Sequence, residues 1–369
     1  MIPRFPPPGL VPALCLLAAP ALAGPAEDCR NPDLARADRI APCTAAIGAA
    51  ADVADKADLL LYRGANLYNT GDYAAAEADF AAARKLRPDW ADPYVERGYM
   101  LQSQGDDAGA AAEMREGLRV EPGSTYAVVG LMSLLADAGR WQECFDTVAL
   151  ASPAAQSDPE VVANRGRCRA ELGDHEAALA DDRDAIARGY DEAWVHGNMA
   201  WSLIALDRPE EAVEEARLAV SREPGFVNGH RNLIEALVQV GRVDEAVDDF
   251  RLADLPEPAD RMQVANTLAW SLFQAGRGDK GLPFAQDAMA AMGEAGLRDA
   301  DVVDTYAHLL MVNGRPDDAA KAFMEAVAID PGYRDGYARR LAGLGYPGDP
   351  AQLEASLLAC AKTGPGCGM

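Results

Sequence analysis

The sequence predicts an all-α solenoid built from short helix pairs that stack on one another. Glycines on a 34-residue period are the first observation, and Asp207 occupies the one skipped place: Gly71, Gly105, Gly139, Gly173 and Gly241. A fixed period of this length indicates a repeat array, in which each unit buries its apolar face against its neighbours. The period therefore predicts the fold class, although it does not identify a partner.

Small residues and prolines recur at fixed distances from these glycines. A small residue follows five places later, as Ala76, Ala110, Cys144, Ala178, Ala212 and Ala246. A proline closes several units 17 places later, as Pro88, Pro122, Pro224 and Pro258. Small residues on both sides of a turn are typical of two closely packed antiparallel helices. Glycine suits the end of the first helix, and proline cannot continue the second.

Composition and charge narrow the classes of partner. The chain has 369 residues, is 49% hydrophobic and carries a formal net charge of -24. Such an acidic chain repels polyphosphate, which argues against nucleic acid as a partner. A basic partner is one reading of this charge, and a solvated acidic surface that keeps the array soluble is the favoured one.

The first 23 residues are expected to be a secretory signal peptide. Arg4 precedes an apolar stretch at residues 10–17, and a small-x-small cleavage pattern at residues 21–23 precedes Gly24. The stretch is too short to span a bilayer, and no later stretch reaches the ~20 apolar residues that a transmembrane helix needs. We therefore expect a periplasmic or secreted chain without a transmembrane segment.

Six cysteines remain when Cys15 is removed with the signal peptide. They fall into three sequence-local pairs, which favours disulfides in an oxidising compartment: Cys29 with Cys43, Cys144 with Cys168, and Cys360 with Cys367. Six cysteines allow 15 pairings, so the connectivity stays open at this stage. For the middle pair, buried free thiols are an alternative.

The repeating pattern resembles the tetratricopeptide repeat. The resemblance is carried by residues 62–64 through Pro88, residues 96–98 through Pro122, and residues 164–166 through Ala185. It implies a right-handed superhelical solenoid, in which we count about eight repeats: 57–90, 91–124, 125–158, 159–192, 193–226, 227–260, 262–295 and 300–333. The period slips by one residue before Gly276, and the third repeat is the weakest.

The flanks are expected to be helical caps. Residues 24–56 form an N-terminal cap with Cys29 and Cys43, residues 57–333 the array, and residues 334–369 a C-terminal cap with Cys360 and Cys367. Residues 341–346 are faintly similar to the start of a peptidoglycan-binding three-helix domain. An alternative function is therefore that of a cell-envelope assembly or peptidoglycan-associated accessory protein.

No catalytic constellation is recognised in the sequence. The four histidines lack metal-ligand spacing, and there is no nucleophile-elbow serine or phosphate-binding glycine loop: His175, His196, His230 and His308. Too few residues remain outside the array for a catalytic domain. We expect a non-catalytic scaffold without a cofactor or metal.

Three asparagines follow the same period as the glycines. Asn164, Asn198 and Asn232 each lie nine residues before the turn position. The resemblance places them on the first helix of each repeat, which lines the concave side of such a superhelix. A row of carboxamides can hold the backbone of an extended peptide, because each offers a donor and an acceptor. The competing interpretation is that these asparagines only fix neighbouring helices.

Aromatic residues lie close to the asparagines. Trp201 and Trp270 occupy equivalent places in repeats five and seven, and Trp194 lies one turn before Asn198. We expect these tryptophans to be apolar anchors for a peptide or a partner helix, with Arg231 beside them. The alternative is that Trp201 and Trp270 pack between repeats. Few basic residues accompany the asparagines, so capture of an acidic C-terminus is weakly supported.

Overall fold

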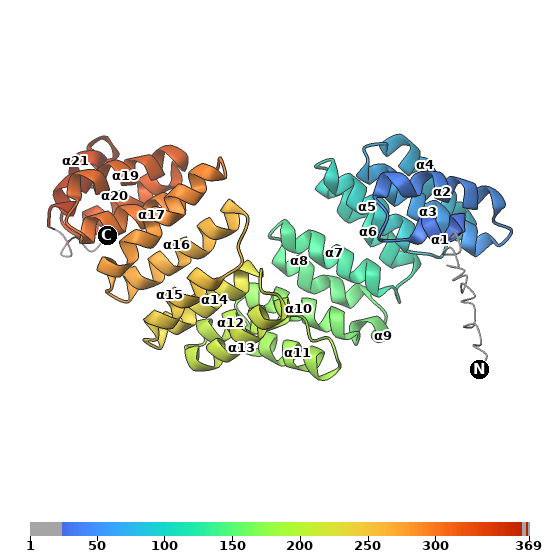
Figure 1. Ribbon diagram of the computed structural model, residues 1–369, viewed down its shortest axis with the longest axis horizontal. Coiled ribbons are helices and arrows are strands. Elements are labelled where there is room, and N and C mark those ends of the chain that lie inside the picture. The colour runs from blue at the N-terminus through green and yellow to red at the C-terminus, as the bar shows by residue number, and fades with distance from the viewer. Residues whose placement is uncertain (1–23, 364–366, 368–369) are drawn as a thin grey trace, which may run out of the picture. The chain divides into compact units, whose positions relative to one another are not determined.

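A computed structural model describes residues 24–363 and residue 367, and this part of the chain contains α-helices and short 3-10 helices without a strand (Figure 1). The all-α solenoid predicted from the glycine period is confirmed. The expected signal peptide lies outside the described residues.

Eight helix pairs occupy the eight predicted repeats. They are α3 (Val53–Asn69) with α4 (Tyr73–Leu86), α5 (Asp92–Ser103) with α6 (Asp107–Val120), α7 (Thr125–Asp137) with α8 (Trp141–Thr147), α10 (Pro159–Glu171) with α11 (His175–Ala187), α12 (Ala193–Ala205) with α13 (Pro209–Arg222), α14 (Val227–Gln239) with α15 (Val243–Leu252), α16 (Pro258–Gln274) with α17 (Gly278–Glu294), and α18 (Ala300–Val312) with α19 (Pro316–Ile329). We call the first member of each pair its A helix and the second its B helix.

Shorter elements flank and interrupt the pairs. They are α1 (Pro25–Arg30), α2 (Arg36–Ala49), a 3-10 turn (Val148–Leu150), α9 (Pro153–Gln156), α20 (Gly332–Gly343), a second 3-10 turn (Pro350–Gln352) and α21 (Leu353–Ala361). The first A helix starts four residues earlier than the predicted repeat, because Asp52 caps it by accepting a hydrogen bond from the Asp55 backbone N–H. α16 starts at Pro258, inside the predicted sixth repeat, since proline suits a first helical turn.

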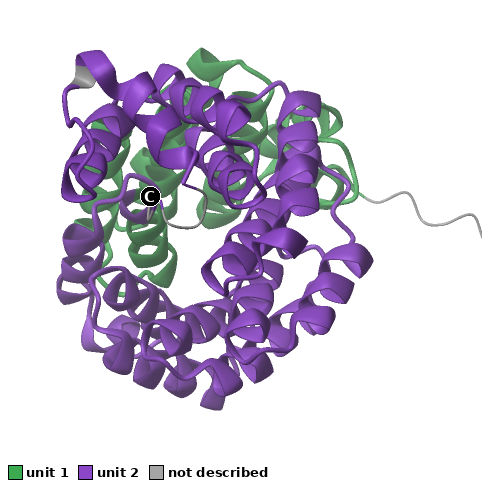
Figure 2. Cartoon of the chain, turned by 90° about the vertical axis from the view of Figure 1, so that its left-hand side faces the viewer, with its two compact units in different colours: residues 1–134 green, residues 135–369 purple. Residues whose placement is uncertain are grey.

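The chain divides into two compact units, residues 1–134 and 135–369 (Figure 2). Unit 1 holds α1 to α6 and most of α7, whereas unit 2 holds α8 to α21. The division falls inside α7, in the repeat whose sequence is the weakest match to the period.

Left-handed turns end the A helices where the glycine period predicts them. The glycine φ angles are 91° at Gly71, 81° at Gly105, 66° at Gly139, 85° at Gly173, 78° at Gly241, 70° at Gly276 and 74° at Gly314. Asp207, in the skipped place, is the one non-glycine residue with positive φ in the described part of the chain, at 58°. Glycine adopts this region without the steric cost that a Cβ imposes, so the period follows from backbone geometry.

The two helices of a pair approach closely over a small residue. A Cβ added to Gly64 on α3 would lie 2.6 Å from the Phe80 ring of α4. In the next pair, a Cβ on Gly98 would lie 2.8 Å from the Met114 side chain. The corresponding place in α11 is Asp182, whose carboxylate lies against Gly166. This carboxylate is fully buried, and neither oxygen has a hydrogen-bond partner.

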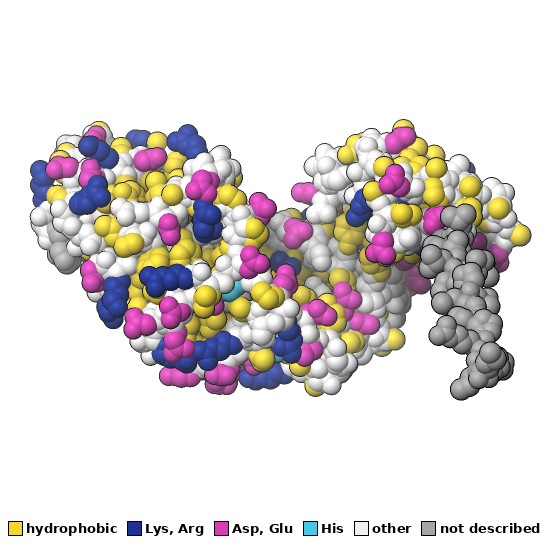
Figure 3. Space-filling view, viewed as in Figure 1, with side chains coloured by type: hydrophobic (Ala, Val, Ile, Leu, Met, Phe, Trp, Pro, Cys, Tyr) yellow, Lys and Arg dark blue, Asp and Glu magenta, His cyan; other side chains and the backbone are white. Residues whose placement is uncertain are grey.

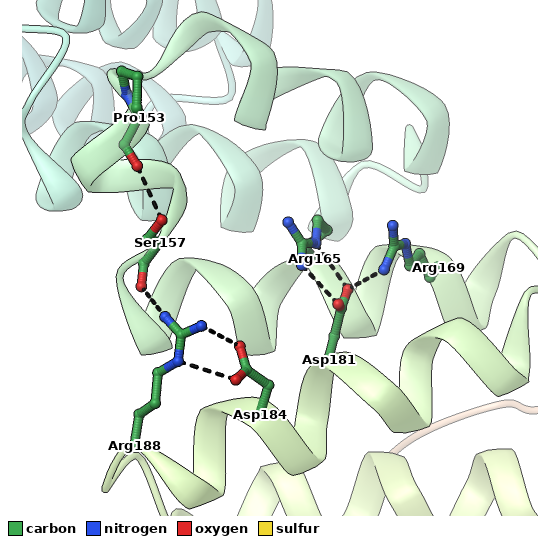
Figure 4. A network of polar contacts seen from close by, with 7 residues as sticks. All are labelled: Pro153, Ser157, Arg165, Arg169, Asp181, Asp184 and Arg188. Atoms are coloured by element: carbon green, nitrogen blue, oxygen red, sulfur yellow. Dashed lines mark hydrogen bonds and ion pairs between the residues drawn. The ribbon is translucent and has the colours of Figure 1, made fainter.

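An acidic residue on the B helix ties each of several pairs together. Asp79 binds Arg63 at 2.7 Å. Figure 4 shows the second cluster, in which Asp181 binds Arg165 and Arg169, each at 2.7 Å. Beside this second cluster, Arg188 contacts Asp184 and the Ser157 carbonyl.

Histidine replaces arginine as the partner in the next two pairs. His196 contacts Glu215 through Nδ1 at 2.7 Å, and His230 contacts Asp249 through Nδ1 at 2.9 Å. Glu215 and Asp249 follow Asp181 at steps of 34 residues, so the acidic place is constant and its partner changes.

Three disulfides join the cysteines in the sequence-local order. The Cα–Cα distances are 4.6 Å for Cys29–Cys43, 6.1 Å for Cys144–Cys168 and 5.0 Å for Cys360–Cys367. These distances lie in the range that disulfide geometry allows. The first links α1 to α2, the second links α8 to α10, and the third closes the C-terminal cap. Within the described residues, no helix combines the length and apolarity required to cross a bilayer.

Candidate functional site

Three pockets lie along the A helices of unit 2, and α20 closes the series. We call the surface that they line the A face of unit 2. The amide pocket has a volume of about 350 Å³ and is lined by Arg167, Glu171, Gly197, Asn198, Trp201, Phe226, Asn228, Arg231, Asn232, Glu235 and Thr267. Its walls come from α10, α12, α14 and α16.

The second pocket, the central pocket, has a volume of about 410 Å³. It is lined by Arg231, Glu235, Asn266, Thr267, Trp270, Ser271, Gln274, Asp301, Asp304 and Thr305. It shares Arg231, Glu235 and Thr267 with the amide pocket, so the two are contiguous.

The third, the C-terminal pocket, has a volume of about 390 Å³. Its lining is Trp270, Asp304, Asp330, Gly332, Tyr333, Gly336, Tyr337 and Arg340. Trp270 and Asp304 also belong to the central pocket, so the A face of unit 2 is continuous from α10 to α20.

The structure places the three asparagines of the period in different surroundings. Asn164 is mostly buried and lines none of these three pockets, and its Nδ2 donates to the Glu160 carbonyl of its own helix at 2.9 Å. Asn232 lines the amide pocket, and its Nδ2 donates to the Gly197 carbonyl of α12 at 2.8 Å. Asn198 lines the same pocket, and its Nδ2 has no hydrogen-bond partner.

The tryptophans also differ in position, although all three are half-buried. Trp201 lines the amide pocket with its ring 5.3 Å from that of His175. Trp270 lines the central and C-terminal pockets and packs edge-to-face on His308, at 5.6 Å. Trp194 packs on Tyr190 at 5.9 Å and lies outside the three pockets.

Arg231 joins two of the pockets. It is exposed on α14, where its Nε donates to Thr267 Oγ1 at 3.1 Å and an Nη atom donates to Asn228 Oδ1 at 3.3 Å. The predicted set therefore meets along the A face through Asn198, Asn232, Trp201, Trp270 and Arg231. Asn164 and Trp194 do not join it.

Several lining residues were missed by the sequence reasoning. Thr267 and Thr305 stand nine residues before the turn glycines Gly276 and Gly314, the same place that the asparagines hold. A search for any polar residue at this place, rather than asparagine alone, would have extended the surface to α18. Ser271 repeats Ser202 directly after the equivalent tryptophan, whereas Glu235 carries no comparable signal.

Burial raises the pKa of an acidic group and of a phenolic group on the A face. Desolvation raises the pKa of the Glu235 carboxyl above its usual range, and Arg231 opposes this only in part. Desolvation also raises the pKa of Tyr337, and its hydroxyl hydrogen bond to Asp304 adds to the effect.

Across the outer surface seen in Figure 3, acidic and basic side chains are interspersed. The described residues hold no group of three or more histidine, cysteine, aspartate or glutamate side chains placed to bind a metal ion.

Comparisons with known proteins agree with this architecture. The tetratricopeptide repeat profile matches residues 198–261, which span α12 to the start of α16. No curated protein matches the sequence. A solved tetratricopeptide repeat protein from Parabacteroides merdae ATCC 43184 superposes with a TM-score of 0.52 at 16% identity, over 73% of this chain and 98% of that chain.

A second solved structure is PilW, a widely conserved type IV pilus biogenesis factor. It superposes with a TM-score of 0.48 at 17% identity, over 56% of this chain and 97% of that chain. The repeat match and the first superposition agree with the helix pairs and their left-handed glycine turns. The matched segment carries the tetratricopeptide repeat pattern, and the superposition shows the tetratricopeptide repeat fold over most of the chain.

Proposed function

We propose that the chain is a non-catalytic interaction scaffold that binds an extended peptide or a partner helix along the A face of unit 2. The observation that carries this proposal is the continuity of the three pockets across successive A helices. Clefts that combine aromatic walls with a few convergent polar groups are the usual form of binding sites. A linear partner fits a surface that repeats every helix pair.

The chemistry of the amide pocket favours recognition of a polypeptide backbone. Asn198 has an amide group without an intramolecular partner, and Asn232 keeps its carbonyl oxygen after its Nδ2 has bonded to Gly197. Carboxamides donate and accept, as backbone binding requires. Trp201 adds a large apolar surface beside them.

Export to an oxidising compartment is the second part of the proposal. It is supported by the three disulfides and by the leader pattern of residues 1–23. Thiol counting on the unfolded, unreduced chain purified from its producing cells is expected to find no free thiol in the mature protein. Six free thiols would contradict export.

The binding proposal is tested by matched variants in the two units. Asn198→Ala, Trp201→Ala and Asn232→Ala are combined in one chain, and Tyr62→Ala with Glu96→Ala, at the corresponding asparagine places of unit 1, form the control. We expect the unit 2 variant to lose the partner that the unaltered chain retains from an envelope extract, with an unchanged circular dichroism spectrum. Equal retention by both variants would overturn the proposal.

A further inference from the structure

We propose that the A face between α14 and α20 binds a cationic side chain, lysine or arginine, of the partner segment. This inference rests on the proposed function and states the chemistry of its partner. Charge is the first observation. The central and C-terminal pockets bring together four carboxylates against the two guanidinium groups of Arg231 and Arg340: Glu235, Asp301, Asp304 and Asp330.

Polar groups without an intramolecular hydrogen bond line the same space. Ser271 and Thr305 line the central pocket with only 6% and 4% of their surface exposed. Neither hydroxyl has a hydrogen-bond partner among the described residues. The Oδ1 atom of Asn266, in the same wall, is buried and also lacks a donor. Buried polar groups are normally hydrogen-bonded, so the Asn266 oxygen indicates a site that a donor completes, and the two hydroxyls can accept from the same donor group.

A lysine ammonium or an arginine guanidinium is such a group. Both carry only donors, and both carry the positive charge that the surrounding carboxylates favour. The phenol hydroxyls of Tyr333 and Tyr337 donate to Asp301 and Asp304 respectively. Each of these two carboxylates keeps acceptor capacity, because one phenol hydroxyl uses only part of it.

Aromatic rings complete the walls. Trp270 borders both pockets. In the C-terminal pocket, the ring centroids of Tyr333 and Tyr337 lie 5.5 Å apart. An aromatic face attracts a cation electrostatically, and tryptophan does so most strongly. Carboxylates and aromatic faces therefore both favour a positive charge, and the Asn266 oxygen adds an acceptor for its N–H groups. A neutral or acidic side chain would leave the half-buried Glu235 carboxylate without a compensating positive charge.

Synthetic peptides test this inference with the full chain. The probes are fluorescein-labelled 12-residue peptides of alternating lysine and serine, glutamine and serine, or glutamate and serine, titrated by fluorescence anisotropy. We expect the lysine peptide alone to bind. Asp304→Asn and Glu235→Gln are each expected to weaken it about tenfold, which corresponds to ~1.4 kcal/mol.

Asp317→Asn is the charge-matched control, since Asp317 is exposed on α19 and lies outside the three pockets. It should change the affinity by less than about twofold, as expected of a screened surface charge. Glu235→Gln protects the test against misfolding of the Asp304 variant, because among the described residues the Glu235 carboxylate accepts one hydrogen bond, a 3.4 Å contact from Gln239. Thermal melts of all variants accompany the titrations.

Each contrary outcome has a distinct meaning. Absence of lysine-peptide binding, or equal weakening by Asp317→Asn, would overturn the cation site. If the glutamine peptide bound as tightly as the lysine peptide, the cation site would also be overturned. If Trp201→Ala weakened this glutamine-peptide binding, the proposed function would still stand. Lysine-peptide binding that depends on Asp304, together with extract capture that ignores Trp201, would retain the cation site and reject the proposed function.

Discussion

The A helices of the two units use the same framework in different ways. At the asparagine place, unit 1 has Tyr62 and Glu96, and Glu96 accepts a 2.8 Å hydrogen bond from the Tyr126 hydroxyl. Unit 2 has Asn198 in that place, with an unpartnered amide beside open pockets. The turns and the close helix contacts are common to both units. The difference teaches that the same repeat framework can leave polar groups paired in one unit and unpaired in the other, and the proposed function assigns binding to the unpaired groups.

The largest predicted effect is on stability, and it compares a residue of the repeat framework with a residue of the candidate site. Phe80 is fully buried against Gly64 in unit 1, so Phe80→Ala is expected to destabilise that unit by about 3–5 kcal/mol. Asn198→Ala in unit 2 is expected to cost less than ~0.5 kcal/mol, because its Nδ2 makes no hydrogen bond to lose. Hydrogen exchange resolved by helix measures each unit separately. A comparable loss at Asn198 would contradict the distinction.

The second effect concerns Asp182, which holds the place of Phe80 and Met114 in the pair α10–α11. Burial, with Asp181 and Glu215 nearby, raises the pKa of Asp182 to about 8. An unfolded aspartate loses its proton near pH ~4, so the unaltered chain should lose stability as pH rises from there to about 8. Asp182→Met is expected to remove this slope and to add at least ~2 kcal/mol at pH 8. Urea unfolding of both chains across this range is the measurement, and parallel pH profiles would refute the assignment.

The third effect is a difference in the pH dependence of stability. It compares helix pairs joined by a histidine–carboxylate contact with pairs joined by an arginine–carboxylate ion pair. Both nitrogens of His196 face carboxylates, of Glu215 and Asp191, and both nitrogens of His230 face acceptors, Asp249 and the Pro224 carbonyl. Each ring must therefore carry two protons to satisfy both partners. Burial opposes this charge, but the hydrogen bonds outweigh it and raise the pKa of both histidines above the usual value.

The stability that these rings supply is fully present below pH ~6.5, the unfolded pKa, and is lost as pH rises through the folded pKa values. The expected size is about 1 kcal/mol for each histidine, the scale of one net hydrogen bond. The Arg63–Asp79 pair of unit 1 has no such dependence at neutral pH, because arginine keeps its charge. Proton NMR titration of the two rings checks the claim. A pKa below the unfolded value for either ring would contradict it.

The smallest effect tests the turn geometry. Asp207 adopts a φ of 58° where the other A-helix turns have glycine. Asp207→Gly is expected to stabilise unit 2 by about 0.5–1 kcal/mol, since glycine carries no Cβ penalty there. Gly173→Asp, at the turn one repeat earlier, is the reciprocal control and should destabilise by a similar amount. Differential scanning calorimetry of both variants measures the pair, and a destabilised Asp207→Gly chain would rule out this explanation.

The fold was predictable because its signals are local. Glycine at a left-handed turn and a small residue at a helix crossing act within one repeat, so Gly71 or Ala76 can be interpreted without knowing their neighbours. The one-residue slip before Gly276 was also visible, and the structure starts the seventh pair earlier, at Pro258.

The candidate site was less predictable because it depends on which polar groups remain unpaired. Asn164 and Asn232 look alike in sequence, yet one donates to its own helix and the other to the neighbouring α12. Aspartate is a residue type that normally lies in solvent. Asp182 is nevertheless buried, at the place where Phe80 packs in α4 and Met114 packs in α6. Such outcomes follow from tertiary contacts between repeats, which spacing alone does not encode.

Photo-cross-linking tests the central claim most directly. A benzoylphenylalanine is placed at Gln239 or Gln274, each two residues before a turn glycine of unit 2, and at Ser103, the corresponding place in unit 1. The account predicts that Gln239 and Gln274 label one short continuous segment of the same partner, and that Ser103 labels none of it. Labelling from Ser103 alone, or unrelated segments from Gln239 and Gln274, would contradict a linear partner on the A face of unit 2.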